Sequence, residues 1–436
     1  MFLITFLICI LIAVNEYRNA KRLYSPVFLF ACFWAIISFM AGLQLYGLYE
    51  SSTDAYVCVL SGVLSFWGGA KFSDINYKPK ICSYVLSKKR FNIALVLCIV
   101  GLYLNIVFLI QFARSGLSIS HIYYLMASTV TGEDTELSAL YSTNLVRLQQ
   151  FIGYPLLFTI VPIAFLEFLS SKKKFYLFIF VGLSVLRFCY DFRRLYLVII
   201  VVFAVFVLIL KKYRYSYSSK LTMSQKFKFL FFSLLFLCVY TSISGERRGE
   251  DEQSYSLFEN MYLYYAGSIP YFSQRLELIN DTVYTFGFSS FRGLMSPFCA
   301  LGRILVGVEP MFMTIANENV NSLHNVVLTV QNGGEGFNSY ATCFFQFFQD
   351  GGYCGIIIMS FLFGFYAYHL YLDVIYNKEN RNIMRYSLFL SIFIFLSVLH
   401  FNGVVICYIW PFVIERFLYK KTGHLQNPVS DAYHEK

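Results

Sequence analysis

Apolar residues along the chain gather into blocks of about 15–25 residues, and short charged stretches separate these blocks. A helix needs about 20 apolar residues to cross the hydrocarbon core of a bilayer. In lipid, every backbone N–H and C=O must be paired within the protein, which favours helices. The pattern therefore predicts an all-α polytopic membrane protein.

We expect about eleven transmembrane helices, and one long loop between the eighth and the ninth. The segments with this pattern are 2–14, 26–49, 55–70, 91–113, 150–169, 175–189, 195–210, 227–243, 353–376, 384–399 and 403–418. The chain then divides into spans one to eight (1–243), the loop (244–352), spans nine to eleven (353–418) and a tail (419–436). Apolar pieces of the loop are too short to span, so we expect them to form interfacial or re-entrant helices.

Composition and charge agree with this picture and add an orientation. Charged residues make up 14% of the chain, against about 25% in soluble domains. The net charge of +10 is not a nucleic-acid signature, because six alternate loops hold all eighteen lysines and 25 of the 35 Lys and Arg residues. Basic loops face the cytoplasm. The N-terminus and the 244–352 loop are therefore expected on the outer face and the C-terminus inside.

The basic residues expected on the outer face, or in the membrane near it, are all arginines. They are Arg114, Arg147, Arg187, Arg193, Arg194, Arg247, Arg248, Arg275, Arg292 and Arg303. A planar guanidinium recognises phosphate or carboxylate through two parallel hydrogen bonds. The doublets at 193–194 and 247–248 lie at the outer ends of spans, at the depth of a lipid head group. Alternatively, selection for membrane orientation alone excludes lysine from the outer face, and the arginines there pair with acidic residues.

Other candidate residues lie later in the long loop. His324, in "NSLHNVV", could act as a general base or be a hydrogen-bonded loop histidine. Asp350 precedes the ninth span, where a charge is costly unless it is paired or functional. Asn338 and Tyr340 offer amide and hydroxyl groups to a sugar. Alternatively, residues 332–355 form a re-entrant turn with Asp350 as a helix cap.

The sequence holds no motif for a metal or a nucleotide. There is no DxD, no HExxH and no clustered His/Cys set, and no Walker or dinucleotide glycine motif. We therefore expect no cofactor, no metal and no nucleic-acid partner. The energy for any reaction would come from the substrate.

Several stretches between about residues 185 and 365 resemble the bacterial oligosaccharide repeat-unit polymerases, which assemble O-antigen and capsule. They are "YDFRRLYL", "GERRG", "YYAGSIPYF", "FGFSSFRGL" and "FNSYATCFFQFFQDGGYCG". The resemblance implies an enzyme of the bacterial inner membrane. It would transfer a glycan from undecaprenyl diphosphate to the distal sugar of a new lipid-linked repeat unit on the outer, periplasmic face. A chain-length regulator and a flippase are further candidate partners.

The resemblance also implies roles for the candidate residues. Arg193, Arg194, Arg247 and Arg248 would hold a diphosphate. Arg275, Arg292 and Arg303 would hold a second diphosphate or anionic sugars. His324 would match the single loop histidine of the related O-antigen ligases, although the glycine spacing after it differs from theirs. Asp350 is the alternative base.

Three other functions stay open at this point. An O-antigen ligase would use closely similar chemistry. A multi-span glycosyltransferase would carry an acidic motif in its first outer loop, where this chain has Glu50 and Asp54. A flippase or transporter would need charges within its spans, for which Arg187 and Glu167 are the candidates, and would have no use for the long outer loop.

Overall fold

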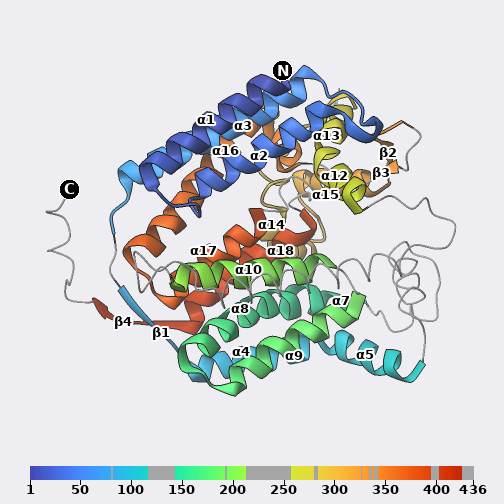
Figure 1. Ribbon diagram of the computed structural model, residues 1–436. Helices are drawn as coiled ribbons and strands as arrows, with labels where there is room; N and C mark the ends of the chain where they lie inside the picture. The colour runs from blue at the N-terminus through green and yellow to red at the C-terminus, as the bar shows by residue number, and fades with distance from the viewer. Residues whose placement is uncertain are drawn as a thin grey trace, which may run out of the picture. The chain divides into compact units, whose positions relative to one another are not determined.

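A computed structural model describes residues 1–79, 82–115, 143–191, 194–212, 257–278, 283–325, 327–332, 336–337, 342–393 and 402–424. It is mostly helical (Figure 1), which agrees with the all-α part of the predicted class. Five helices are long and apolar enough to cross a membrane: Phe2–Ala20, Pro26–Leu43, Thr53–Asn76, Leu145–Ser171 and Cys343–Tyr376. A bent pair, Lys88–Gly101 and Tyr103–Ile110, makes up to six. These apolar helices support a membrane protein, and the total of eleven spans stays a prediction.

Helices overlap ten of the eleven predicted segments, and the eighth, 227–243, lies outside the described residues. The described parts of the last two, α17 (Asn380–Phe393) and α18 (Asn402–Leu418), have 14 and 17 residues. Both are shorter than the approximately 20 residues of a typical span. Two small two-stranded sheets were not predicted. One pairs β1 (Cys82–Leu86) with β4 (Tyr419–His424), and the other pairs β2 (Leu328–Thr329) with β3 (Gly336–Phe337).

The chain forms two compact units. The first comprises residues 1–85, 258–413 and 419–436, and the second comprises 86–257 and 414–418. The second unit holds α4 (Lys88–Gly101), α5 (Tyr103–Ser115), α7 (Thr143–Leu148), a π-helix (Gln149–Gly153), α8 (Tyr154–Ser171), α9 (Lys174–Asp191) and α10 (Arg194–Lys212).

A bend interrupts the fourth predicted span in this second unit. Helices α4 and α5 meet at 53° where the sequence predicted one continuous helix over 91–113. The backbones of Gly101 and Gly153 touch so closely that neither could carry a Cβ. Beside them, the Gln149 amide donates a hydrogen bond to Asn105 Oδ1 at 2.6 Å. The end of α4 therefore packs against the π-helix at the position of the bend.

The core of the first unit lies between α1 (Phe2–Ala20), α2 (Pro26–Leu43), α3 (Thr53–Asn76) and α16 (Cys343–Tyr376), which Figure 1 shows side by side. Small residues let α3 and α16 approach closely, as is usual between membrane helices. A Cβ on Gly69 would collide with the Phe361 carbonyl, and one on Gly364 would collide with the Phe66 carbonyl.

Helix α16 is broken at Gly351 and Gly352. Gly352 has φ 62° and ψ −141°, a conformation that only glycine adopts readily. The chain reverses here, because the Phe347 carbonyl lies against Gly355, although the two residues are eight positions apart. The break divides α16 into a short arm and a long arm, and the long arm begins at residue 353, where span nine was predicted to start.

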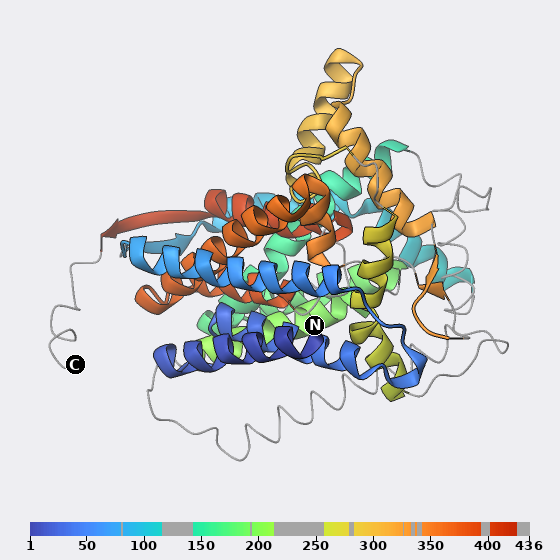
Figure 2. The ribbon, with the colours of Figure 1, turned by 90° about the horizontal axis from the view of Figure 1, so that it is seen from above.

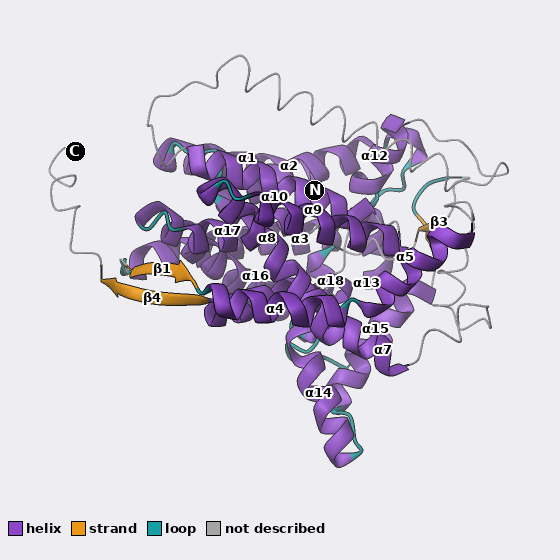
Figure 3. Ribbon diagram, turned by 90° about the horizontal axis from the view of Figure 1, so that it is seen from below, coloured by secondary structure: helices purple, strands orange, loops and turns teal. Residues whose placement is uncertain are grey.

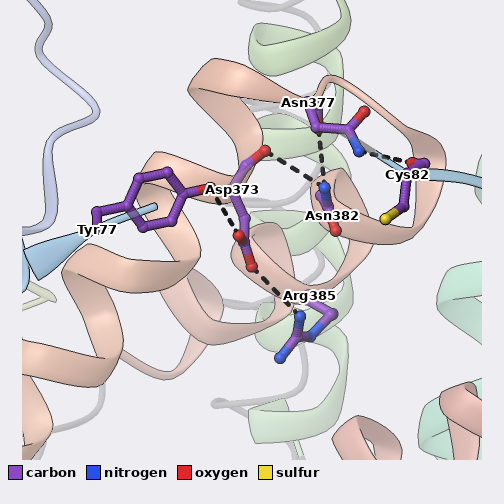
Figure 4. Close-up of polar contacts among 6 residues, drawn as sticks. All are labelled: Tyr77, Cys82, Asp373, Asn377, Asn382 and Arg385. Carbon is purple, nitrogen blue, oxygen red and sulfur yellow. Dashed lines mark hydrogen bonds and ion pairs between the residues drawn. The ribbon is translucent and has the colours of Figure 1, made fainter. Parts of the chain in front are cut away.

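Polar contacts tie the helices together at the end of the first unit away from this break (Figure 4). Asp373 accepts a hydrogen bond from the Tyr77 hydroxyl at 2.9 Å and pairs with Arg385 at 3.5 Å. The Asn377 amide donates to the Cys82 carbonyl at 2.7 Å. Burial and the Asp373 carboxylate raise the pKa of Tyr77, so that its hydroxyl stays a donor. These bonds join α3, β1, α16 and α17.

Four further helices lie at the opposite end of the first unit: α12 (Leu257–Ala266), α13 (Ser268–Glu277), α14 (Arg292–Val306) and α15 (Met311–Asn325). Together with the 283–291 turn they form what we call the helical cap. The Tyr262 hydroxyl accepts a hydrogen bond from the Leu45 amide, and Ser273 Oγ accepts one from the Ser52 amide. Helices α12 and α13 therefore pack across the connection between α2 and α3. Helices α14 and α15 form a hairpin that projects sideways from α1, α3 and α16 (Figures 2 and 3).

Candidate functional site

The helical cap brings together three of the predicted substrate-binding arginines and Asp350. Arg275 lies at the end of α13, Arg292 begins α14 and Arg303 lies in its last turn. Asp350 ends the short arm of α16 and contacts the 283–291 turn. Residues separated by up to 75 positions in the sequence therefore lie at one end of the first unit.

Asp350 binds the turn that precedes α14. Its Oδ1 accepts hydrogen bonds from the Thr285 hydroxyl at 2.6 Å and from the Ser289 amide at 3.0 Å. Its Oδ2 accepts from the Ser290 amide at 2.9 Å and from the Ser290 hydroxyl. Successive backbone amides of this kind form an anion-binding concavity. The carboxylate that fills it is 4% exposed, which fits a residue that positions the turn.

Backbone bonds complete this junction. The Thr285 amide donates to the Gln349 carbonyl at 3.0 Å, and the Phe286 amide donates to the Asp350 carbonyl at 3.1 Å. These are carbonyls at the end of the short arm of α16, which have no partner within a helix. The 283–291 turn thus binds the end of the short arm of α16, and this contact fixes the position at which α14 begins.

Arg275 is buried, with 4% of its surface exposed. Its guanidinium donates to the Tyr271 hydroxyl at 2.7 Å and to the Ser322 carbonyl at 3.2 Å, and lies 5.1 Å from the Tyr271 ring. Ser322 is in the last turn of α15, where free carbonyls and the helix dipole attract a cation. This geometry fits an arginine that joins α13 to the end of α15.

Arg292 and Arg303 are connected to the same carboxylate, Glu309, the first through Asn317 and the second directly. Arg292 Nε donates to Asn317 Oδ1 at 2.7 Å, and the Asn317 amide donates to Glu309 at 3.0 Å. Arg303 pairs with the other oxygen of Glu309 at 3.8 Å and is largely exposed, so this pair is weak. Asn317 is the only hydrogen-bond partner of the Arg292 side chain within the described part of the chain. The two terminal nitrogens of Arg292 are therefore available to a ligand.

Partial burial shapes the electrostatics of Arg292. Desolvation lowers the pKa of its guanidinium below the usual value, and the nearby Glu309 carboxylate partly opposes this effect. A cation that has lost part of its water shell gains more from an added anion than an exposed one does. Among the three arginines of the cap, Arg292 is the best placed to bind a phosphate or a carboxylate.

The other predicted site residues are only partly described. His324 lies in the last turn of α15, two residues after the Ser322 carbonyl that Arg275 contacts, and its side chain is outside the described part. Arg194 begins α10 in the second unit. Five predicted site residues lie outside the described residues: Arg193, Arg247, Arg248, Asn338 and Tyr340.

Arg187, another arginine of the outer set, lies in α9 of the second unit, which also holds Arg114 in α5 and Arg147 in α7. The Arg187 guanidinium stands 4.7 Å from the ring of Tyr154 and 5.7 Å from that of Tyr196. A cation over an aromatic face is stabilised by the ring quadrupole. This environment explains how a charge can lie within the apolar helix α9.

Sequence reasoning missed the residues that organise the arginines. Asn317 and Glu309 connect Arg292 to Arg303, and Ser289 and Ser290 hold Asp350. No local spacing signals these partners. No group of three or more His, Cys, Asp or Glu side chains that could hold a metal occurs among the described residues, and metal independence stays a prediction. Compared with protein-family models, curated proteins and solved structures, the chain shows no match.

Proposed function

We propose that the protein polymerises polyprenyl-diphosphate-linked oligosaccharide repeat units on the outer face of the bacterial inner membrane. The growing glycan would leave its polyprenyl diphosphate and join a sugar hydroxyl of the next lipid-linked unit. One C–O bond to the diphosphate breaks and one glycosidic bond forms. The hydroxyl proton passes to a base, and the diphosphate leaves as an anion.

The observation that carries this proposal is the state of Arg292. It is half-buried and held through Nε by a neutral amide, so its terminal nitrogens can bind two oxygens of one phosphate. Cationic donors aimed at a leaving diphosphate stabilise the charge that develops on it. Arg303, in the last turn of α14, would add a second positive charge.

The roles of the remaining residues follow from their surroundings. Arg275 and Asp350 position the cap, because each is buried and bonded to backbone groups of another element. His324 becomes the first candidate for the base, since the Asp350 oxygens already accept hydrogen bonds from the 285–290 turn. The doublets Arg193–Arg194 and Arg247–Arg248 remain candidates for the second diphosphate.

A gene-deletion experiment separates this function from its alternatives. Loss of a polymerase leaves a surface glycan that contains only single repeat units. Loss of a ligase leaves repeat chains on the lipid carrier with none attached. Loss of a flippase leaves the lipid-linked units in the inner leaflet. The proposal predicts the first outcome, and either of the other two contradicts it.

A further inference from the structure

Helix α14 carries an apolar stripe that the described part of the chain leaves largely exposed. Exposed fractions along it are 58% for Phe298, 54% for Leu301 and 74% for Leu305. Spacings of three and four residues place these positions on one face of the helix. The tip of the hairpin extends the stripe with Val306, Val308 and Met311, at 75%, 68% and 65% exposed.

The second helix of the hairpin has a different surface. Beyond Met311, the exposed residues among the described side chains of α15 are polar: Thr314, Glu318 and Asn321. The hairpin thus presents an apolar helix and tip together with a polar helix. Contiguous apolar surface of this kind is rare on a water-facing protein surface.

The position of the hairpin indicates what covers the stripe. Figures 2 and 3 show α14 and α15 lying across the direction of α1, α3 and α16 and extending beyond them. At its root, the Phe298 ring lies 6.1 Å from the ring of Trp410 in α18. Gly287, just before α14, lies against Met359 of α16. The stripe is therefore continuous with the apolar surface of helices that belong in a membrane.

The geometry points to a hairpin that lies in the lipid–water interface, with the α14 stripe and the 305–308 tip inserted among the acyl chains. An amphipathic helix in this position buries its apolar face about 5–10 Å below the head groups. Arg303 and Glu309 flank the tip as an exposed ion pair, at the depth where lipid phosphates lie. Bilayer lipid is favoured over a protein partner because the stripe leads directly onto membrane helices.

Tryptophan fluorescence with brominated lipids tests this placement on the full chain. Leu305→Trp and Val306→Trp are each reconstituted in nanodiscs of phosphatidylcholine, with or without bromine near the head-group end of the acyl chains. Both positions are exposed, so either substitution is compatible with folding. The signal of the three native tryptophans is subtracted with the unmodified protein. Glu318→Trp, on the polar helix of the same hairpin, is the matched control.

The inference predicts that bromine reduces the added emission at both tip positions by about twofold or more, as expected for a side chain among acyl chains. Emission from Glu318→Trp should change little. Tip tryptophans quenched no more than the one at 318 would overturn the inference. A second protein copy or another protein on the stripe would give that same contrary result, since it would shield the tip from lipid.

Discussion

Asp350 accepts a hydrogen bond from the backbone amide of Ser290 at 2.9 Å, across 60 positions of sequence. This bond attaches the end of the short arm of α16 to the turn that precedes α14, the helix that begins with Arg292. The position of Arg292, the arginine of the cap best placed to bind an anion, therefore depends on a carboxylate next to a break in α16.

Replacing Asp350 with Asn should destabilise the protein. The Asn amide would face the amides of Ser289 or Ser290, donor against donor, and a buried N–H would lose its partner. We expect the free energy of unfolding to fall by about 1–3 kcal/mol. Denaturant titration of the purified protein in mixed micelles measures this. Glu318→Gln, at an exposed carboxylate, is the control, and an equal midpoint for the two variants would contradict the role of Asp350.

Gly352→Ala should be harmful for a different reason. The φ of 62° and ψ of −141° suit only glycine, and the new Cβ would stand 2.9 Å from the Tyr284 hydroxyl. Strain of this type costs about 1–3 kcal/mol. The control is Gly302→Ala in α14, where no atom lies within 4 Å of the added Cβ. Alanine is the better helix former there, so this variant should unfold no earlier than the wild type in the same titration.

The sequence contained a local signal for the break but not for its partners. Two adjacent glycines before an apolar run predict an interrupted helix, and the long arm of α16 begins at residue 353, where span nine was predicted to start. The partners of Asp350 are about 60 residues away, and nothing near Ser289 and Ser290 marks them. The bend between α4 and α5 was also missed, and the residue that Gly101 contacts there, Gly153, is about 50 residues further along.

The candidate site likewise combines residues that the sequence alone selects with partners that only the tertiary structure reveals. Residue type alone selected Arg275, Arg292 and Arg303, since lysine is absent from the outer set. Their environments depend on tertiary contacts: Arg275 on the end of α15, and Arg292 on Asn317. The hydrophobic pattern also predicted a loop at 82–86 and a tail at 419–424. A strand pair formed from two such distant segments has no local signal in the sequence.

Arg292 and Arg275 should respond differently to substitution. Arg292→Ala should reduce glycan chain growth at least about tenfold, the effect of losing one charge-assisted contact of about 1.4 kcal/mol or more, while leaving folded protein in normal amount. Arg292→Lys should restore little, because the planar fork is lost. Arg275→Ala should instead lower the amount of folded protein. Glycan length on gels and size-exclusion profiles measure the two effects, and normal chain lengths with Arg292→Ala would remove this residue from the site.

The two doublets outside the cap supply a separate prediction. Arg248→Ala and Arg193→Ala should each abolish chain growth without loss of protein, because each would remove a fork that grips a lipid diphosphate. Surface glycan length in complemented deletion cells, with the membrane level of each variant as the control, measures this. Wild-type chain lengths in both variants would exclude the doublets from diphosphate binding.

Polymerisation by the purified protein is the most direct test of the central claim. The full chain is mixed with a purified lipid-linked repeat unit, with and without a metal chelator, and the products are resolved by size. The account predicts a ladder of elongated glycans, release of free polyprenyl diphosphate, and the same ladder with chelator present. Repeat units that stay single in the presence of folded protein would contradict it.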